Sequence, residues 1–468
     1  MQVFTYSGAR FSPYGDEERP GTAEGLDEAG NWPAPRATGP LGARIALPGS
    51  KSLTNRELVL SALASGPSVL RRPLHSRDSM LMIEALRSLG VAVDEVAGES
   101  GTESPDLRIT PPAELSGSTS IDCGLAGTVM RFLPPVAALA LGPVAFDGDE
   151  GARRRPMRTT IDSLRSLGVD VNDDGRGALP FSLWGSGRVR GGEIAIDASA
   201  SSQFVSGLLL AAARFDEGLT LRHTGERLPS MPHIEMTIAT LEARGVRVES
   251  PEPGVWVVAP GPLAGIHVDI EPDLSNAAPF LVAAVIAGGT VAVEGWPAST
   301  TQVGADLETL LPHFGATVRR EGSQLVVDGG AGLLGGLRVP GIRLDLSTGG
   351  ELAPALVALA ALAEGPSEIT GIGHLRGHET DRLAALAAEI NGLGGAVTEL
   401  DDGLAIEPRP LHGGTWKAYD DHRMATAGAI IGLAVDGVLV DDIGSTSKTM
   451  PQFASLWHTM LDQTAPSP

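Results

Sequence analysis

The chain has 468 residues, of which 42% are hydrophobic, and it carries a formal net charge of −22 at pH 7. So acidic a chain is ill-suited to general nucleic-acid binding, which relies on a basic surface. No apolar run reaches the ~18 residues that a membrane span needs, and a single cysteine, Cys123, excludes both an intramolecular disulfide framework and a cysteine-based metal cluster. We therefore expect a globular, cytoplasmic protein without a secretory signal.

Residues 1–31 are rich in glycine, proline, aspartate and glutamate and show no sustained hydrophobic period. This composition predicts a disordered N-terminal extension, with the folded part beginning near Trp32. The next apolar run, Ile45–Leu47, predicts a short strand that leads into an alanine-rich helix ending near Ala64.

The turn between these two elements, Pro48–Arg56, reads PGSKSLTNR and brings two cations and several small polar side chains to the start of the helix. The unpaired N–H groups and the positive dipole end of a helix N-terminus favour an anion there. Lysine is otherwise rare, because the chain holds only Lys51, Lys417 and Lys448. The alternative is an ordinary surface helix capped by serine or threonine, and the stretch by itself leaves both interpretations open.

A repeat runs through the whole folded chain. Six alanine-rich apolar segments each end at a glycine and lead into a strand-like run, and these glycines lie 71 to 76 residues apart, at positions 66, 142, 218, 289, 365 and 437. Between them, a second helical pattern such as IEALRSLG leads to another strand. The repeat predicts an α/β protein built from six β-α-β-α-β units.

The two helices of each unit differ in character. The first is apolar on nearly all sides, which predicts burial, whereas the second carries charges on one face and should cover a sheet from outside. Six buried helices are too many for one core of this size, so we expect three in each of two domains. If the helices of each domain run parallel, their N-termini meet at one end. Two such ends facing each other form a cleft lined with positive dipole ends.

The six helix starts carry polar side chains that suit such a cleft. They read GSKSLTNR (49–56), GLAGTVMR (124–131), SASSQFVSG (199–207), PDLSNAAPF (272–280), STGGELAP (347–354) and DDHRMATAG (420–428). Capping preferences account for Ser202, Thr128 and Ser275. They do not account for the cations just inside apolar helices, where an unpaired cation is costly: Lys51 with Arg56, Arg131 and Arg423. We therefore predict a shared anion site.

Three linker motifs add further cations to this site: RRRPMR (153–158), HLRGHETDR (374–382) and GSTSKTMP (444–451).

The sequence does not support a metal site or a nucleotide-binding site. The pair His374 and His378 has HxxxH spacing but lies in a glycine-containing loop without a third ligand. Neither GxxxxGK[ST] nor a GxGxxG that opens a Rossmann unit occurs, so we expect no metal, ATP or NAD and no other cofactor.

Seven motifs, GSKSLTNR, LAGTVMR, RRRP, SSQF, ETDR, DDHRM and SKT-P, occur in an order and at spacings that resemble those of the 5-enolpyruvylshikimate-3-phosphate synthase family. The resemblance runs from Trp32 to Trp457. It implies the inside-out α/β barrel of the enolpyruvyl transferases, an α/β fold of two domains, each of three βαβαββ-type repeats with buried parallel helices. It also implies that residues 32–49 plus 270–468 form the first domain and residues 50–269 the second, with the active site in the cleft between them.

The activity implied by this resemblance is transfer of the enolpyruvyl group of phosphoenolpyruvate to the 5-hydroxyl of shikimate-3-phosphate, with release of phosphate. The partners implied are these two small molecules, with no nucleic acid and no membrane, and the protein is expected to be a monomer. The catalytic residues implied are Lys51, Glu351 and Glu379. The shikimate-3-phosphate contacts implied are Lys51, Ser52, Arg56, Ser201, Ser202, Gln203, Ser230, Glu351 and His378. The phosphoenolpyruvate contacts implied are Lys51, Gly127, Arg155, Gln203, Arg382, Arg423 and Lys448.

Two positions depart from the family pattern. The motif that usually reads Lys-Glu-[Ser/Thr]-Asp-Arg begins with His378 here, and a histidine is charged only part of the time near neutral pH. The acidic residue that is commonly aspartate is Glu351, which is one methylene longer.

Two alternatives remain. The sister transferase that acts on a UDP-amino sugar uses a reactive cysteine in a mobile loop and a Lys-Asn pair, whereas this chain has Lys51-Ser52 and places Cys123 directly before a helix start. A non-catalytic anion-binding relative would keep the cleft and lose the chemistry, and His378 is the feature that favours it. Phosphate release that depends on shikimate-3-phosphate distinguishes these possibilities.

Overall fold

The computed structural model describes residues 25–98 and 104–464. Of the predicted disordered extension, residues 1–24 lie outside the described residues, whereas the seven that follow are described and form turns held by the Asp27 carboxylate, which accepts from the backbone N–H of Ala29 and Asn31. The first strand, β1 (Trp32–Pro33), begins where the folded part was expected to begin. No helix in the described ranges has the length and hydropathy that crossing a membrane requires.

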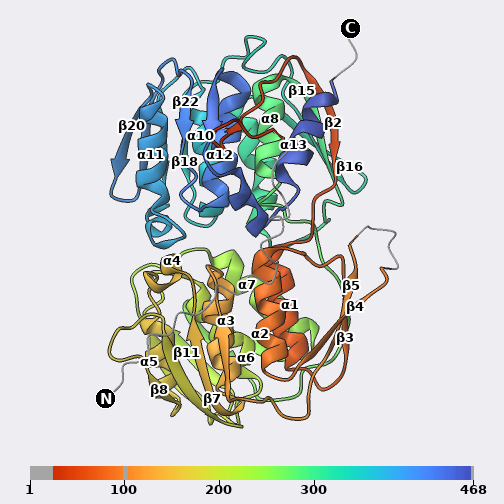
Figure 1. The fold of residues 1–468 in the computed structure, drawn as a ribbon, viewed down its shortest axis with the longest axis vertical. Helices are drawn as coiled ribbons and strands as arrows, with labels where there is room; N and C mark the ends of the chain where they lie inside the picture. Colours follow the sequence, from red (N-terminus) through yellow and green to blue (C-terminus); the bar gives the residue numbers. More distant parts are fainter. Residues whose placement is uncertain (1–24, 99–103, 465–468) are drawn as a thin grey trace.

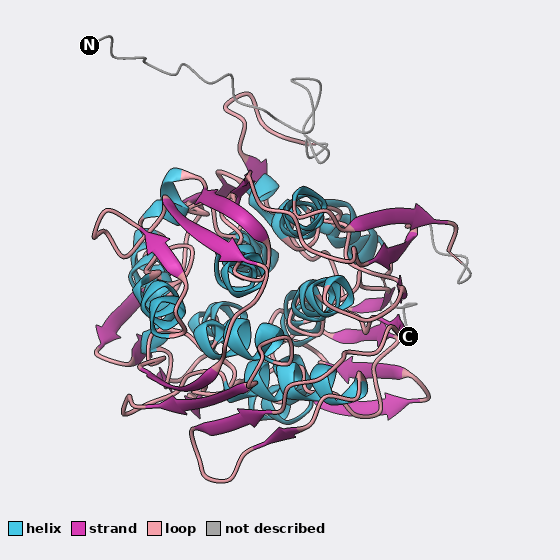
Figure 2. Cartoon of the chain, turned by 90° about the horizontal axis from the view of Figure 1, so that it is seen from below, coloured by secondary structure: helices cyan, strands magenta, loops and turns pink. Residues whose placement is uncertain are grey.

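The molecule consists of two domains stacked along its long axis (Figure 1). Its buried apolar side chains form two separate clusters, one in each domain. Seen from below, helices gather in the interior and strands lie around the periphery (Figure 2). This is the two-domain, inside-out α/β arrangement that the repeats and the family resemblance predicted.

The lower domain of Figure 1 contains three four-stranded sheets. In spatial order their strands are β14 (His267–Asp269), β3 (Ser68–Arg71), β5 (Asp106–Thr110) and β4 (Ala92–Val96); β6 (Thr119–Asp122), β7 (Leu141–Asp147), β9 (Phe181–Ser186) and β8 (Asp170–Asn172); and β10 (Gly192–Ile196), β11 (Leu219–His223), β13 (Val255–Val258) and β12 (Val248–Glu249). The helices of this domain are α1 (Lys51–Ala62), α2 (Arg77–Ser88), α3 (Gly127–Ala137), α4 (Glu150–Arg153), α5 (Arg158–Ser166), α6 (Gln203–Ala212) and α7 (Met231–Ala243).

The upper domain repeats this plan with two four-stranded sheets and a three-stranded one. Their strands are β16 (Thr317–Glu321), β17 (Gln324–Asp328), β15 (Gly289–Glu294) and β2 (Leu41–Ile45); β18 (Arg343–Asp345), β19 (Ser367–Thr370), β21 (Gly403–Glu407) and β20 (Ala396–Leu400); and β1, β23 (Val438–Val440) and β22 (Gly414–Trp416). Its α-helices are α8 (Ala278–Ala287), α9 (Leu307–Leu310), α10 (Ala353–Ala361), α11 (Arg382–Gly392), α12 (His422–Ala434) and α13 (Phe453–Asp462). Its 3-10 helices are η1 (Val303–Asp306), η2 (Leu311–Phe314), η3 (Gly350–Leu352), η4 (Gly373–Gly377) and η5 (Ile443–Lys448).

In four of the repeats, one apolar helix joins two strands that pair in parallel. Helix α3 joins β6 to β7, and α6 joins β10 to β11, and in both cases the two strands pair in parallel. The first helix of each repeat lies in the interior of its domain. In α3 and α8, for example, every residue is buried. Helices α3 and α6 pack so closely that a Cβ at Gly207 would lie 2.2 Å from the Arg131 carbonyl oxygen, so a residue without a side chain is required there.

In each domain, one sheet includes a strand that is distant in sequence from its other strands. Strand β2 pairs in parallel with β15, and β14 pairs in parallel with β3. The two crossing segments meet at an isolated bridge between Gly49 and Pro272. The strand predicted at Ile45–Leu47 was misplaced, because β2 ends at Ile45, and its alternate side chains are buried against the core while the next residues turn toward the bridge.

Candidate active site

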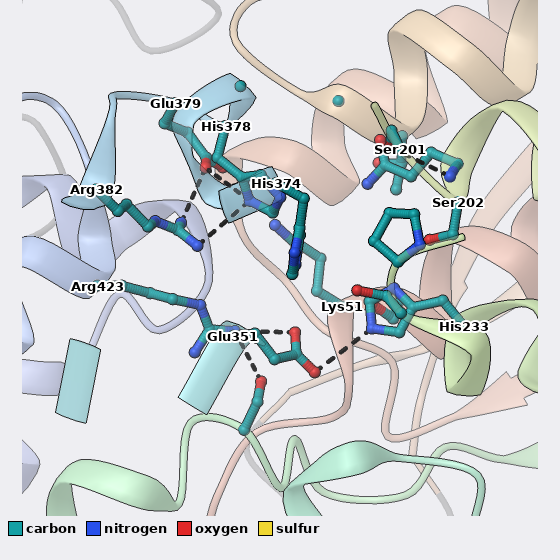
Figure 3. Close-up of a pocket in the computed structure, with 18 of the residues that line it drawn as sticks. Lys51, Ser201, Ser202, His233, Glu351, His374, His378, Glu379, Arg382 and Arg423 are labelled. Atoms are coloured by element: carbon teal, nitrogen blue, oxygen red, sulfur yellow. Dashed lines mark hydrogen bonds and ion pairs between the residues drawn. The ribbon is translucent and has the colours of Figure 1, made fainter. Parts of the chain in front are cut away.

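A pocket lies between the two domains, and residues of both line it (Figure 3). The predicted site residues that line it are Lys51, Ser52, Gly127, Arg155, Ser201, Ser202, Gln203, Ser230, Glu351, His378, Glu379, Arg382 and Arg423. Most of them occupy helix starts: α1 begins at Lys51, α3 at Gly127 and α6 at Gln203. The positive dipole ends of these helices therefore face the pocket.

One wall of the pocket is a buried charge cluster around Glu379. Its carboxylate accepts from Lys448 Nζ at 2.5 Å and from Arg382 Nη2 at 2.9 Å. Arg382 is in turn fixed by Asp421, with Nε–Oδ2 and Nη2–Oδ1 distances of 2.8 and 3.1 Å. Burial alone would raise the pKa of Glu379, but the positive charges of Lys448, Arg382 and Arg155 outweigh it and hold the pKa well below its usual value. Glu379 is therefore ionised at neutral pH.

Glu351 links the two domains across the pocket. Its Oε1 lies 3.4 Å from His233 Nε2 of the lower domain, and its Oε2 accepts from Arg423 Nη2 of the upper domain at 3.2 Å (Figure 3). Burial by itself would raise the pKa of Glu351. The nearby His233 and the cations Arg423 and Lys51 outweigh burial and lower the pKa below its usual value. Glu351 is thus an ionised carboxylate that accepts hydrogen bonds from both domains.

Lys51 points toward the middle of the pocket between these groups (Figure 3). Its Nζ lies 3.3 Å from Asp78 Oδ2, whose side chain is only 2% exposed. Its backbone N–H donates to Asp273 Oδ2 at 3.1 Å. One carboxylate therefore holds the ammonium and another holds the start of the helix.

The opposite wall has buried guanidinium groups with unused donors. Among the described residues, the Nε atoms of Arg131 and Arg155 are buried without a hydrogen-bond partner. Arg131 Nη1 donates to Gln203 Oε1 at 3.2 Å. A Cβ at Gly127 would lie 2.8 to 3.0 Å from Arg155, Arg131 and Gln203, so this glycine leaves the space that the two arginines need. Buried cations with free donors are suited to an anion.

The comparisons with known proteins agree with this geometry. A sequence model described as EPSP synthase (3-phosphoshikimate 1-carboxyvinyltransferase) matches residues 35–457. The chain belongs to the EPSP synthase family. A 3-phosphoshikimate 1-carboxyvinyltransferase of Kocuria rhizophila is 57% identical over 448 residues, which cover 94% of this chain and 99% of the relative.

Solved structures of enolpyruvyl transferases share the fold. An EPSP synthase structure from Acinetobacter baumannii superposes with a TM-score of 0.73 at 24% identity, covering 92% of this chain and 97% of that one. The enolpyruvyl transferase NikO from Streptomyces tendae gives a TM-score of 0.70 at 18% identity, covering 91% and 96%. At these identities the likeness extends to the fold alone.

Two of the residues predicted from the EPSP synthase resemblance lie behind the pocket wall. Arg56 is 1% exposed and donates to Thr237 Oγ1 at 2.8 Å and to the carbonyl oxygens of Ser52 and His233, both at 2.9 Å. It therefore ties α1 to α7 beneath the pocket, and its burial lowers its pKa to about 9. Lys448 is 5% exposed and reaches the pocket through Glu379.

Several lining residues of this EPSP synthase family member were not among the contacts that the resemblance implied: Thr128, Arg131, His233, Asp273, Ser275, Asn276, His374 and His422. Of these, Arg131 had been assigned to the predicted anion site on its position at a helix start. His422 lies inside the DDHRM motif, and His233 lies three residues after Ser230, so proximity to a predicted residue was an available signal. Asp78 had no such signal, because its role depends on the approach of α2 to Lys51. In the described ranges, no group of three or more histidine, cysteine, aspartate or glutamate side chains could hold a metal ion.

Proposed function

We propose that this protein is a 3-phosphoshikimate 1-carboxyvinyltransferase, which transfers the enolpyruvyl group of phosphoenolpyruvate to the 5-hydroxyl of shikimate-3-phosphate and releases phosphate. The observation that carries this proposal is the interdomain pocket, in which buried cations with free donors surround two ionised glutamates. Two substrates that carry two phosphates and two carboxylates match that charge distribution. The 57% identity to a curated enzyme of this name supports the assignment.

The two substrates occupy opposite sides of the pocket in this proposal. Shikimate-3-phosphate binds against the serines of the lower domain, Ser201, Ser202 and Ser230, with its hydroxyls near Glu351. Phosphoenolpyruvate binds against Arg382 and the other cations that face the upper domain. In Figure 3, Ser201, Ser202 and His233 lie on the right of the pocket, and Arg382 and Arg423 lie on the left. The remaining contacts proposed are Ser52, Gln203, Arg56 and His378 for the first substrate, and Gly127, Arg155, Gln203, Arg423 and Lys448 for the second.

The lowered pKa values of the two glutamates support the following proposal for the proton transfers. Both are ionised at neutral pH, so the proton that phosphoenolpyruvate receives comes from the Lys51 ammonium, which points into the pocket. The 5-hydroxyl oxygen attacks C2, its proton passes to Glu351, and the methylene carbon takes the proton from Lys51. In the elimination step the amine of Lys51 takes a proton back from the methyl group, and the phosphate that leaves C2 takes the proton held by Glu351, so both side chains return to their starting states. The charge of Glu379 stabilises the positive charge that builds at C2.

The alternatives are less well supported. Cys123 is fully buried and burial raises the pKa of its thiol, so it lacks the exposure and thiolate character of a reactive cysteine. This disfavours the chemistry of the UDP-amino-sugar transferase. A non-catalytic relative would have no need to keep Lys51, Glu351 and Glu379 around one pocket.

We propose residues 32–49 plus 270–468 and residues 50–269 as the two domains, and we propose that they close on the substrates. The pairing of β2 with β15 and of β14 with β3 supports these boundaries. Closure would exclude water and strengthen each charge interaction. A monomer and a cytoplasmic location remain predictions, and sedimentation of the purified protein tests the first.

Phosphate release tests the activity directly. The purified protein is mixed with phosphoenolpyruvate, with and without shikimate-3-phosphate, and inorganic phosphate is measured over time. Release that requires shikimate-3-phosphate is the expected result. Absence of release by folded protein would refute the enzyme assignment, whereas release stimulated only by a UDP-amino sugar would support the sister activity.

A further inference from the structure

Two consecutive residues directly before helix α12 have a strained backbone. Tyr419 has φ +56° and Asp420 has φ +54°, and among the described residues they are the only neighbouring non-glycine residues with positive φ. This left-handed region is unfavourable for residues with side chains, above all bulky ones. The segment therefore needs contacts that hold it, and the next residue is Asp421, which holds Arg382.

A buried carboxylate supplies those contacts. Glu389 of α11 is 8% exposed, and its Oε2 accepts from the Lys417 backbone N–H at 3.0 Å while its Oε1 accepts from the Tyr419 hydroxyl at 2.5 Å. From the other side, Asp441 Oδ1 accepts from the Ala418 backbone N–H at 2.8 Å. Burial and the bond to Glu389 raise the pKa of Tyr419 to about 12, so the hydroxyl stays a donor at neutral pH.

Helix α11 binds the segment of residues 417–421 at two points. Arg382 and Glu389 are seven residues apart, which is about two helical turns and places them on one face. Arg382 binds the Asp421 carboxylate, and Glu389 binds the backbone and side chain just before it. Asp421 also caps α12 by accepting from the Arg423 N–H at 2.9 Å. The backbone conformation of the Tyr419–Asp420 pair thus sets the position of Asp421 relative to Arg382 and Arg423.

We infer that Tyr419 and Glu389 are positioning residues for the phosphoenolpyruvate half of the pocket. Their hydrogen bond holds the left-handed segment, which fixes Asp421 and through it the direction in which Arg382 faces the pocket. Neither Tyr419 nor Glu389 lines the pocket, so they act only through Asp421. The inference rests on the proposed function, because it assigns them to one substrate of that reaction.

The test is steady-state kinetics with each substrate varied separately. Tyr419→Phe removes one hydroxyl from a partly exposed ring, and we expect the KM for phosphoenolpyruvate to rise about threefold to tenfold, the size of one weakened hydrogen bond to a charged group. The KM for shikimate-3-phosphate should not change. Adding Asp420→Gly to Tyr419→Phe should restore the KM for phosphoenolpyruvate, because glycine adopts the left-handed backbone without strain. Lys417→Met is the control, because Lys417 binds Glu389 through its backbone N–H, which the substitution keeps.

Three outcomes would overturn the inference: an unchanged KM for phosphoenolpyruvate, an equal rise in both KM values, or no restoration by Asp420→Gly. Should Tyr419→Phe fail to fold, Glu389→Gln provides the same test, because it keeps an acceptor but removes the charge. If the unmodified enzyme releases no phosphate in the presence of shikimate-3-phosphate, the proposed function itself is refuted. The two failures are therefore distinguishable.

Discussion

Replacement of Lys51 by methionine separates the two tasks that the structure gives this side chain. One is the proposed proton transfer, whose loss should lower kcat about a thousandfold, since general acid catalysis contributes about 10²- to 10⁴-fold. The other is neutralisation of Asp78, whose carboxylate is 2% exposed and lies 3.3 Å from the Lys51 ammonium. Removing one partner of a buried ion pair costs about 3 to 5 kcal/mol. Because Lys51 is 19% exposed and Lys448 also faces Asp78, we expect about 2 to 3 kcal/mol here.

Thermal unfolding and phosphate release measured on the same variants test both parts. Lys51→Met should unfold roughly 5 to 10 °C below the unmodified protein, given about 2 to 4 °C per kcal/mol for a domain of this size. The double variant Lys51→Met with Asp78→Asn should recover most of that stability and none of the turnover. Turnover within tenfold of the unmodified enzyme would refute the proton assignment. A double variant no more stable than Lys51→Met would refute the pairing with Asp78.

Three further predictions concern other carboxylates. Glu351→Gln should lower kcat about 100-fold in the phosphate assay, and near-normal turnover would remove its role as the base. Glu57→Gln should reduce the free energy of unfolding in urea by about 3 kcal/mol, because it leaves Arg244, 0% exposed, without its charge partner; an effect below about 1 kcal/mol would contradict this. Arg165 and backbone N–H groups lower the pKa of Asp173 to about 2. Since this is below the value of the unfolded chain, the stabilisation is present above about pH 4 and disappears toward pH 2. Asp173→Asn should therefore cost about 1 to 2 kcal/mol at pH 7, with solvent screening of the half-exposed Arg165 allowed for, and nothing near pH 2.

The fold was predictable because its repeat is visible in the sequence as regularly spaced apolar segments. Burial on all sides of α8 follows from its lack of polar residues, and the periodic glycines mark where each buried helix gives way to a strand. The position of β2 was less predictable. The pairing that fixes β2 is to β15, more than 240 residues away, so no local pattern specified the register.

The candidate site was predictable where its residues occupy helix starts and not where they approach through tertiary contacts. Lys51 and Arg423 could be identified because cations at the start of apolar helices are unusual. Asp78 and Glu389 could not, because each is an ordinary acidic residue on a surface-type helix until the fold brings it to its partner. Arg56 shows that a cation at a helix start can also join two helices beneath the pocket.

The histidine at position 378 shows how the surroundings redefine a departure from the family motif. Burial, and then the charge of Arg382, lower the pKa of His378 well below its usual value and favour the neutral ring over the part-time cation expected from its sequence. Arg382 Nη1 lies 3.3 Å from His378 Nδ1, and since a guanidinium can only donate, Nδ1 is the acceptor. The proton of the neutral ring must then reside on Nε2, which is left free to donate. A neutral donor in place of a lysine keeps one hydrogen bond while it avoids a second full positive charge against Arg382.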